Sequence, residues 1–240
     1  MAFNSFKKLL FGFAFSPSLK ANVFEVTRLA SFLEASLVFV HVGEKTTEKE
    51  TLFNAILEEC PDKPKNVELH WKTGNPVETL IKICQTFEID LLLLGALKHE
   101  KMLKYYLGSI ARQITRKAPC SVLLMLNPSI IRQPCKYIVV NGFDSPQTQD
   151  TIEAAFEMGQ ALKAEKLTLV EEISEARVAI AVNDDRSLRK ATLRKEKINR
   201  EEKMRLHDVI DKIPAHKLEG MNWSTQSIFG RRGYSIGHYA

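Results

Sequence analysis

The sequence predicts an α/β fold, with a five-stranded parallel sheet, helices on both faces, and a partial second copy of the same arrangement. Three observations predict it. The apolar runs LLLL at 91–94 and SVLLM at 121–125 show no polar alternation, which is typical of strands covered on both faces. Amphipathic helical patterns separate such runs, as right-handed βαβ crossovers require. Finally, an offset of 129 residues relates two segments of the chain.

The first copy contains an ordered series of strands and helices. Strands are expected at residues 8–15, 37–42, 67–72, 91–94 and 121–125. Helices are expected between them at about 19–33, 49–59 and 77–87, and a fourth begins near Gly108-Ser109. Gly74-Asn75-Pro76 is a turn followed by a helix start, because proline suits the first helical turn.

The second copy repeats the first strand, helix and strand. Ser16-Pro17 pairs with Ser145-Pro146, Leu33 with Leu162, Ala35 with Ala164, and Val38 with Leu167. Its expected elements are strands at 137–142 and 167–173, a helix at about 148–162, an apolar run at 178–182 and a strand near 221–224. Residues 233–240 look like a turn and an early helix. We therefore expect a complete domain at 1–130 and an incomplete or degenerate one at 131–240.

Composition places the chain among ordinary globular proteins, with 45% hydrophobic and 26% charged residues and a net charge of +5. Its four cysteines have no metal-like spacing, which predicts reduced thiols in a cytoplasmic compartment. No segment approaches the roughly 18 apolar residues of a membrane span. Residues 186–205 hold nine Lys/Arg against three acids. That stretch is interpreted as a solvated helix face or a charged loop, with an acidic-partner or nucleic-acid contact as the alternative.

The region between the last two strands of the first copy has the frame of a phosphate site. Gly95 closes a strand and Gly108-Ser109 opens a helix. Glycine lets an anion approach the backbone, and the free N–H groups at a helix N-terminus favour negative charge. Where a further glycine would complete the cradle, the chain has Lys98.

These residues resemble the universal stress protein family in a tandem arrangement. The family's nucleotide-binding members carry G-x2-G-x9-G-[ST], and Gly95, Lys98 and Gly108-Ser109 stand at those places with the spacing intact. His41-Val42 is similar to the family's second-strand ending, and Gly74-Asn75-Pro76 to its G-x-P turn. The resemblance implies a Rossmann-like, adenine nucleotide alpha hydrolase-like fold. It also implies a site for ATP or AMP, with Mg²⁺ only as the companion of ATP. The residues it implies for nucleotide binding are Val42, Gly95, Lys98, Gly108, Ser109 and Ile110.

Two departures from the family pattern concern function. The first-strand acid that contacts the adenine or ribose end of ATP is replaced by Ala14, which has no side-chain acceptor. Lys98 can close the approach of the phosphates sterically, or pair with a phosphate as a point charge. In the second copy, Asp144 is displaced by one residue from the acid's place, and an Asx-type turn is the favoured interpretation. No catalytic residue and no metal site is predicted.

Three functional hypotheses follow. The first is a non-enzymatic stress-response or regulatory protein with a degenerate ATP site. The second is an ATP-binding or AMP-binding member that uses Lys98 on the phosphates, with at most slow hydrolysis. The third is an acidic-partner or nucleic-acid contact through residues 186–205.

Association is expected in each case, because the strand at 121–125 forms a sheet edge. The resemblance implies homodimerisation at that edge, or intramolecular pairing of the two repeats. Because the second copy has no strand to match 121–125, either the chain is a fragment of a longer tandem protein or another subunit completes the assembly. Protein partners are expected, a membrane is not, and nucleic acid is the disfavoured partner.

Overall fold

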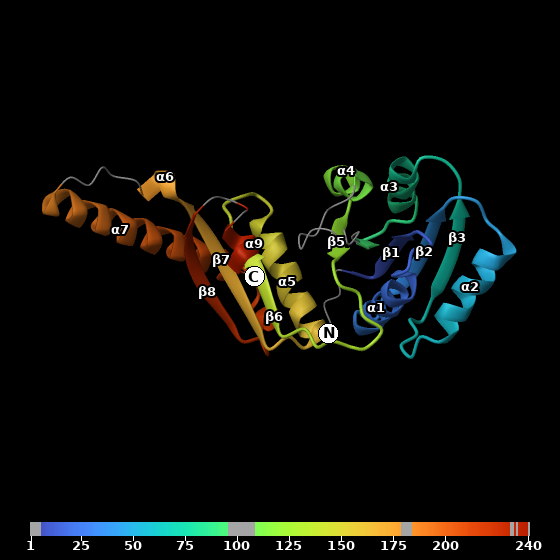
Figure 1. The fold of residues 1–240 in the computed structure, drawn as a ribbon. Coiled ribbons are helices and arrows are strands. Elements are labelled where there is room, and N and C mark those ends of the chain that lie inside the picture. The colour runs from blue at the N-terminus through green and yellow to red at the C-terminus, as the bar shows by residue number, and fades with distance from the viewer. Residues whose placement is uncertain (1–5, 96–108, 179–183, 231–232, 234, 240) are drawn as a thin grey trace. The chain divides into compact units, whose positions relative to one another are not determined.

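A computed structural model describes residues 6–95, 109–178, 184–230, 233 and 235–239 (Figure 1). The chain divides into two compact units, with the boundary between Gln133 and Pro134. Each unit has its own parallel sheet and its own apolar core. The two units are therefore described separately.

The first unit is built on a five-stranded sheet in the order β3-β2-β1-β4-β5, and every neighbouring pair is parallel. Its strands are β1 (Lys8–Phe13), β2 (Ser36–Val42), β3 (Val67–Lys72), β4 (Leu91–Gly95) and β5 (Ser121–Met125). The helices are α1 (Leu19–Phe32), α2 (Thr47–Glu58), α3 (Pro76–Thr86) and α4 (Ser109–Lys117). The predicted α/β class and the five-stranded parallel sheet are confirmed.

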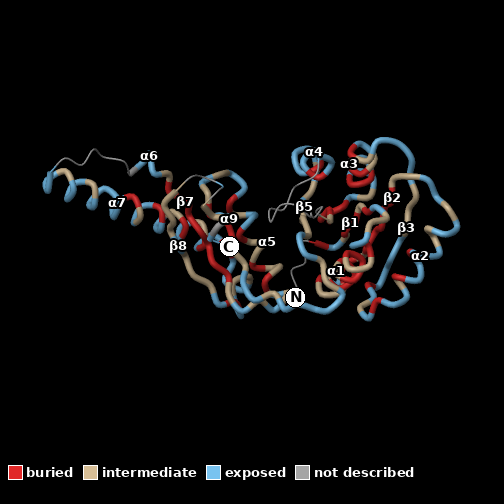
Figure 2. Tube along the Cα trace, in the orientation of Figure 1, coloured by how far each residue is buried: buried red, intermediate tan, exposed pale blue. Residues whose placement is uncertain are grey.

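The two faces of this sheet have different packing chemistry. Leu10, Val38, Val40, Leu92 and Leu94 pack in one aliphatic cluster with residues of α3 and α4. The opposite face is aromatic, because Phe11, Phe13 and Phe39 meet Phe53 of α2 there. Successive strand residues point to opposite faces, so apolar side chains at consecutive positions give a sheet buried on both sides (Figure 2).

The second unit has a three-stranded parallel sheet in the order β6-β7-β8 within its described residues. Its strands are β6 (Tyr137–Asn141), β7 (Lys166–Ser174) and β8 (Trp223–Gly230). The helices are α5 (Thr148–Leu162), α6 (Glu175–Val178), α7 (Asp185–Ile210), α8 (Ala215–Leu218) and α9 (Ser235–Tyr239). This order repeats the β1-β2-β3 portion of the first unit.

One detail of the repeat prediction is wrong by one residue. Leu9 pairs with Leu37 in the first sheet, and Ile138 pairs with Leu167 in the second. The structural counterpart of Leu167 is therefore Leu37, where the constant offset gave Val38. The second copy has one additional residue between the end of its first helix and its second strand, and sequence matching alone did not detect it.

The expected strand near 221–224 is longer in the structure, where β8 spans Trp223–Gly230. The charged region 186–205 is helical and lies within α7. A capping box begins that helix: the Asp184 carboxylate accepts the Ser187 N–H at 2.7 Å, and the Ser187 hydroxyl bonds back to the Asp184 N–H at 3.0 Å.

A buried ionic cluster joins α7 to β7 in the second unit. Arg205 donates hydrogen bonds to the carboxylates of Glu171 and Glu202 and to the Gly142 carbonyl. Burial raises the pKa of Glu171 to about 7, and the neighbouring Glu202 charge adds to the rise, against the pull of Arg205. Arg177 pairs with Glu202 from α6. Both carboxylates are buried. Loss of any one partner of this cluster would therefore leave an unpaired buried charge and destabilise the unit.

We expect Phe53→Ala to destabilise the first unit by about 3–5 kcal/mol, because it removes a fully buried ring from the aromatic face. The Phe53 ring centroid lies 4.7 Å from that of Phe13 and 5.0 Å from that of Phe39. Urea unfolding followed by circular dichroism measures the loss. Leu52→Ala is the matched control, because Leu52 is 52% exposed. Equal losses in the two variants would contradict this packing.

Candidate functional site

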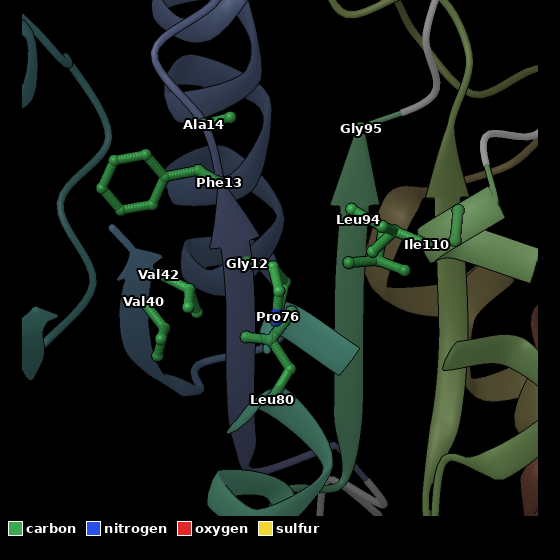
Figure 3. A pocket seen from close by; sticks show the side chains of 11 residues that line it. Gly12, Phe13, Ala14, Val40, Val42, Pro76, Leu80, Leu94, Gly95 and Ile110 are labelled. Carbon is green, nitrogen blue, oxygen red and sulfur yellow. The ribbon is translucent and has the colours of Figure 1, made fainter. Parts of the chain in front are cut away.

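A cavity of about 260 Å³ lies at the carboxyl ends of β1, β2 and β4 (Figure 3). β1 is hydrogen-bonded to β2 on one side and to β4 on the other. The chain order reverses direction between β1 and β4, which makes this edge the topological switch point of the sheet. Open α/β sheets bind ligands at this place.

The described walls of the cavity are apolar. The strands contribute Gly12, Phe13 and Val40, and α3 contributes Pro76 and Leu80. Figure 3 shows Leu80 rising from α3 toward the end of β1, and Leu94 and Ile110 on the opposite wall. The remaining lining residues are Ala14, Val42, Gly95 and Ala111. None of these side chains can donate or accept a hydrogen bond.

Three of the six residues implied for nucleotide binding line the cavity. These are Val42 at the end of β2, Gly95 at the end of β4, and Ile110 in the first turn of α4. Ser109 begins α4 and is exposed. Lys98 and Gly108 lie outside the residues that the structure describes.

Ala14 follows the last residue of β1 and lines the same cavity. Its carbonyl accepts the Ser16 N–H at 2.9 Å, which turns the chain toward α1. The methyl side chain offers no acceptor to a ribose hydroxyl or a purine amine. The position to which the resemblance assigned an acid therefore lies on the cavity wall, and its side chain is a methyl group.

Gly95 also has a packing role that does not involve phosphate. A Cβ at this position would lie 3.1 Å from both the nitrogen and the oxygen of the Asn22 amide. Asn22 is buried on α1, and its Nδ2 donates to the Ser18 carbonyl at 3.0 Å. Its Oδ1 has no partner among the described residues. The glycine is therefore explained by close packing against α1 as well as by an anion site.

Sequence reasoning missed several wall residues, namely Gly12, Val40, Leu80 and Ala111. The strand period offers one signal: Val40 lies two residues before Val42 and so faces the same side. Gly12 has a steric reason, because a Cβ there would lie 2.8 Å from the Leu80 side chain. Leu80 and Ala111 come from helices whose docking depends on the whole core.

The second unit has an ionic cluster near the corresponding strand ends. Asp144 is 81% exposed at its side chain and lies 3.9 Å from Arg205. The Phe143 N–H is bonded to the Asn141 side chain at 3.1 Å, so Asn141 forms the local turn bond there. Asp144 is thus a peripheral member of the Arg205 cluster.

Across the described residues, no group of three or more His, Cys, Asp or Glu side chains is arranged to hold a metal ion. No described helix is both long and apolar enough to cross a membrane. All four cysteines are free thiols, and Cys60 and Cys84 are buried.

Residues 20–125 match the model of the universal stress protein family. This range covers most of the first unit, from α1 to the end of β5. The first unit therefore contains a universal stress protein domain over this range. No curated protein matches the chain in sequence.

Solved structures with the same fold span both units. A universal stress protein from Archaeoglobus fulgidus DSM 4304 matches with a TM-score of 0.62 at 13% identity, over 95% of this chain and 80% of its own. A candidate universal stress protein from Pseudomonas aeruginosa UCBPP-PA14 matches with a TM-score of 0.63 at 13% identity, over 99% of this chain and 79% of its own. At these identities the likeness establishes the fold alone.

A universal stress protein in complex with cAMP matches 50% of this chain and 96% of its own, at 18% identity with a TM-score of 0.43. That score is too low to support an argument about the site.

We expect Asn75→Ala to destabilise the protein by about 1 kcal/mol, because it removes the cap of the helix that carries Pro76 and Leu80. The Asn75 Oδ1 accepts the N–H groups of Val77 at 2.9 Å and of Glu78 at 3.3 Å. Urea unfolding measures the loss. The control is Asn54→Ala in the middle of α2, where the exposed asparagine is no cap and alanine is the better helix former. Loss of stability in Asn54→Ala alone would contradict the capping role.

Proposed function

We propose that this chain is a non-enzymatic stress-response or regulatory protein of the universal stress type, whose nucleotide site no longer binds ATP tightly. The observation that carries the proposal is Ala14. It stands at the cavity end of β1, where binding members of the family have an acid, and it offers no hydrogen-bond acceptor.

The apolar walls support the same conclusion. A ribose hydroxyl or a purine amine that leaves water must find partners in the site, or its desolvation is not repaid. The described wall side chains offer none, so only backbone groups such as those of Val42 remain. Polar groups of a ligand that stay unpaired in such a site lower its binding affinity.

The size of the cavity points the same way. At about 260 Å³ it falls just below the roughly 300–1,000 Å³ that is usual for sites of drug-sized ligands. The side chains of the described lining residues offer neither charge nor hydrogen bonds to a triphosphate and its Mg²⁺.

We further propose that the protein acts through protein contacts in the cytoplasm, as a homodimer or by pairing of its two repeats. β5 supports the homodimer, because among the described residues it is an edge strand of the first sheet, and edge strands can pair with another chain. The four free thiols support a reducing compartment.

The second candidate is an ATP-binding or AMP-binding protein, with at most slow hydrolysis. Gly95 and Ile110 favour it, because they flank the cavity from β4 and from the first turn of α4. A nine-residue helix that starts at Ser109 directs free N–H groups toward that side. In this version Lys98 supplies a positive charge to the phosphates.

Titration calorimetry of the full chain with ATP and AMP tests the proposal. We expect no binding in the low micromolar range for the wild type, and at least about tenfold tighter ATP binding for Ala14→Asp, which equals about 1.4 kcal/mol. Ala55→Asp, at an exposed position of α2, is the control for the added charge. A low-micromolar dissociation constant in the wild type would contradict the proposal.

Two substitutions at Lys98 distinguish steric blocking of the phosphates from loss of a positive charge that would bind them. We expect Lys98→Gly to tighten ATP binding relative to the wild type, because it removes both the Cβ and the long side chain. Lys98→Ala removes the charge and keeps the Cβ, so it should gain less. If both variants bind ATP more weakly than the wild type, Lys98 is a phosphate ligand and the second candidate is favoured. Both substitutions are made in the Ala14→Asp background, where ATP binding is expected to be tight enough to measure by calorimetry.

A further inference from the structure

Helix α7 extends beyond the sheet that it packs on. Between Asp185 and Lys197 no residue is buried, whereas the buried residues of this helix are Ile198, Glu202, Leu206 and Ile210. These four are spaced by four residues and therefore face one side, toward β7 and β8. Figure 2 shows the first half of α7 as mostly exposed, with intermediate segments between, and Figure 1 shows it projecting past the ends of β7 and β8. Only the second half of α7 is therefore held by packing against the sheet.

Cations gather on the outward side of this helix. At 100° per residue, five Lys/Arg residues fall within an arc of about 100°, opposite the buried residues. We call this set the basic stripe: Arg186, Arg189, Lys190, Lys197 and Arg200. All five side chains belong to exposed residues. From Arg186 to Arg200 the stripe is roughly 21 Å long, at 1.5 Å rise per residue.

Most of the stripe is not neutralised within the described parts of the chain. There, Arg186, Arg189, Lys190 and Arg200 make no ion pair, and Lys197 has a loose one to Glu201 at 3.8 Å. That pair is exposed on both sides and is screened by water and salt. On other sides of the helix, Arg205 is paired with Glu171 and Glu202, and Lys195 lies over the Phe229 ring. Lys203 is exposed outside the stripe. Most cations of α7 that have no close ion pair among the described residues therefore lie on one face.

The stripe opposes the stability of its own helix. Arg186 lies three residues before Arg189 and four before Lys190, and like charges at these spacings repel. Little tertiary packing compensates in this half, where the chief supports are the Asp184 capping box and a hydrogen bond from the Arg194 Nε to the Arg177 carbonyl. A polyanion laid along the stripe would remove this repulsion.

The side chains indicate which polyanion fits. The stripe arc contains only Leu193 and Met204 as apolar residues, and no aromatic residue. A protein partner usually needs a cluster of apolar or aromatic anchors, which two isolated side chains do not provide. Single-stranded nucleic acid needs aromatic platforms for its bases, and these are absent too. Binding to a duplex backbone needs only cations at regular intervals, and arginine matches phosphate well.

We propose that the basic stripe of α7 binds the phosphodiester backbone of double-stranded nucleic acid. A helix of this width fits the major groove of B-form DNA, or lies along the phosphates of either duplex. Every side chain of the stripe is Lys or Arg, which pairs with the phosphates of any sequence, so the proposed contact with the backbone is sequence-independent. This surface lies in the second unit and does not depend on the nucleotide site of the first.

Fluorescence anisotropy of the full chain with labelled 25-base-pair DNA and RNA duplexes of one sequence tests the proposal. In the test variant four stripe cations become glutamine: Arg186→Gln, Lys190→Gln, Lys197→Gln and Arg200→Gln. Glutamine favours helix, and circular dichroism checks that α7 is kept. We expect binding that weakens steeply with salt in the wild type. In the variant, affinity at 50 mM salt should fall at least tenfold, and the slope of log K against log salt should drop by about 3–4.

The control variant removes the same charge from exposed lysines of the first unit: Lys63→Gln, Lys65→Gln, Lys72→Gln and Lys82→Gln. Its affinity should stay within about twofold of the wild type. Tighter binding of the RNA or the DNA duplex assigns the preferred helix form, and either result supports the proposal. Equal loss in both variants, a flat salt response, or no duplex binding at 50 mM salt overturns it. It is likewise overturned if polyglutamate or phosphatidylserine vesicles bind as tightly as the duplexes.

Discussion

The pairing of β1 with a parallel neighbour on each side is the constraint on which the first unit depends. Leu9 to Gly12 are hydrogen-bonded into register with β2 and with β4. The Asp90 carboxylate accepts the N–H groups of Lys7 and Lys8, both at 2.9 Å, and so fixes the start of β1 beside β4. Because helices then cross to opposite faces, β1 must be apolar on both sides, and its carboxyl end must open at the switch point of the sheet. The cavity arises from this topology and not from any particular ligand.

Different side-chain interactions join the carboxyl ends of β1 and β2 in the first unit and of β6 and β7 in the second. In the first, the His41 Nδ1 lies 3.1 Å from the Phe13 carbonyl, amid the aromatic cluster. In the second, Gly142 and Glu171 take those two places, and Arg205 of α7 bonds both. A histidine ring in one copy is thus replaced by a buried ion pair in the other. The pair ties α7 to the sheet at its second half and leaves the first half clear, which is what exposes the basic stripe.

Much of the fold follows from local signals in the sequence. The apolar runs at 91–94 and 121–125 predict buried strands, and Asn75-Pro76 predicts the start of α3. The position of the cavity follows in part, since Val42, Gly95 and Ile110 were implied by the family resemblance and line it. Leu80 and Ala111 could not be predicted, because their positions depend on how α3 and α4 dock on the sheet. The Arg205 cluster joins residues 34 and 63 positions apart, and no local pattern signals such pairs. The one-residue insertion before β7 shows only in strand register.

We propose that this chain retains the frame of a nucleotide site while tight nucleotide binding is lost. The most direct measurement is the nucleotide content of the protein as purified, without added nucleotide. Heat release followed by ion-pair chromatography and mass spectrometry identifies any adenine nucleotide carried with the chain. We expect no ATP or AMP above the level found in a control protein that does not bind nucleotides. Near-stoichiometric ATP or AMP would contradict it.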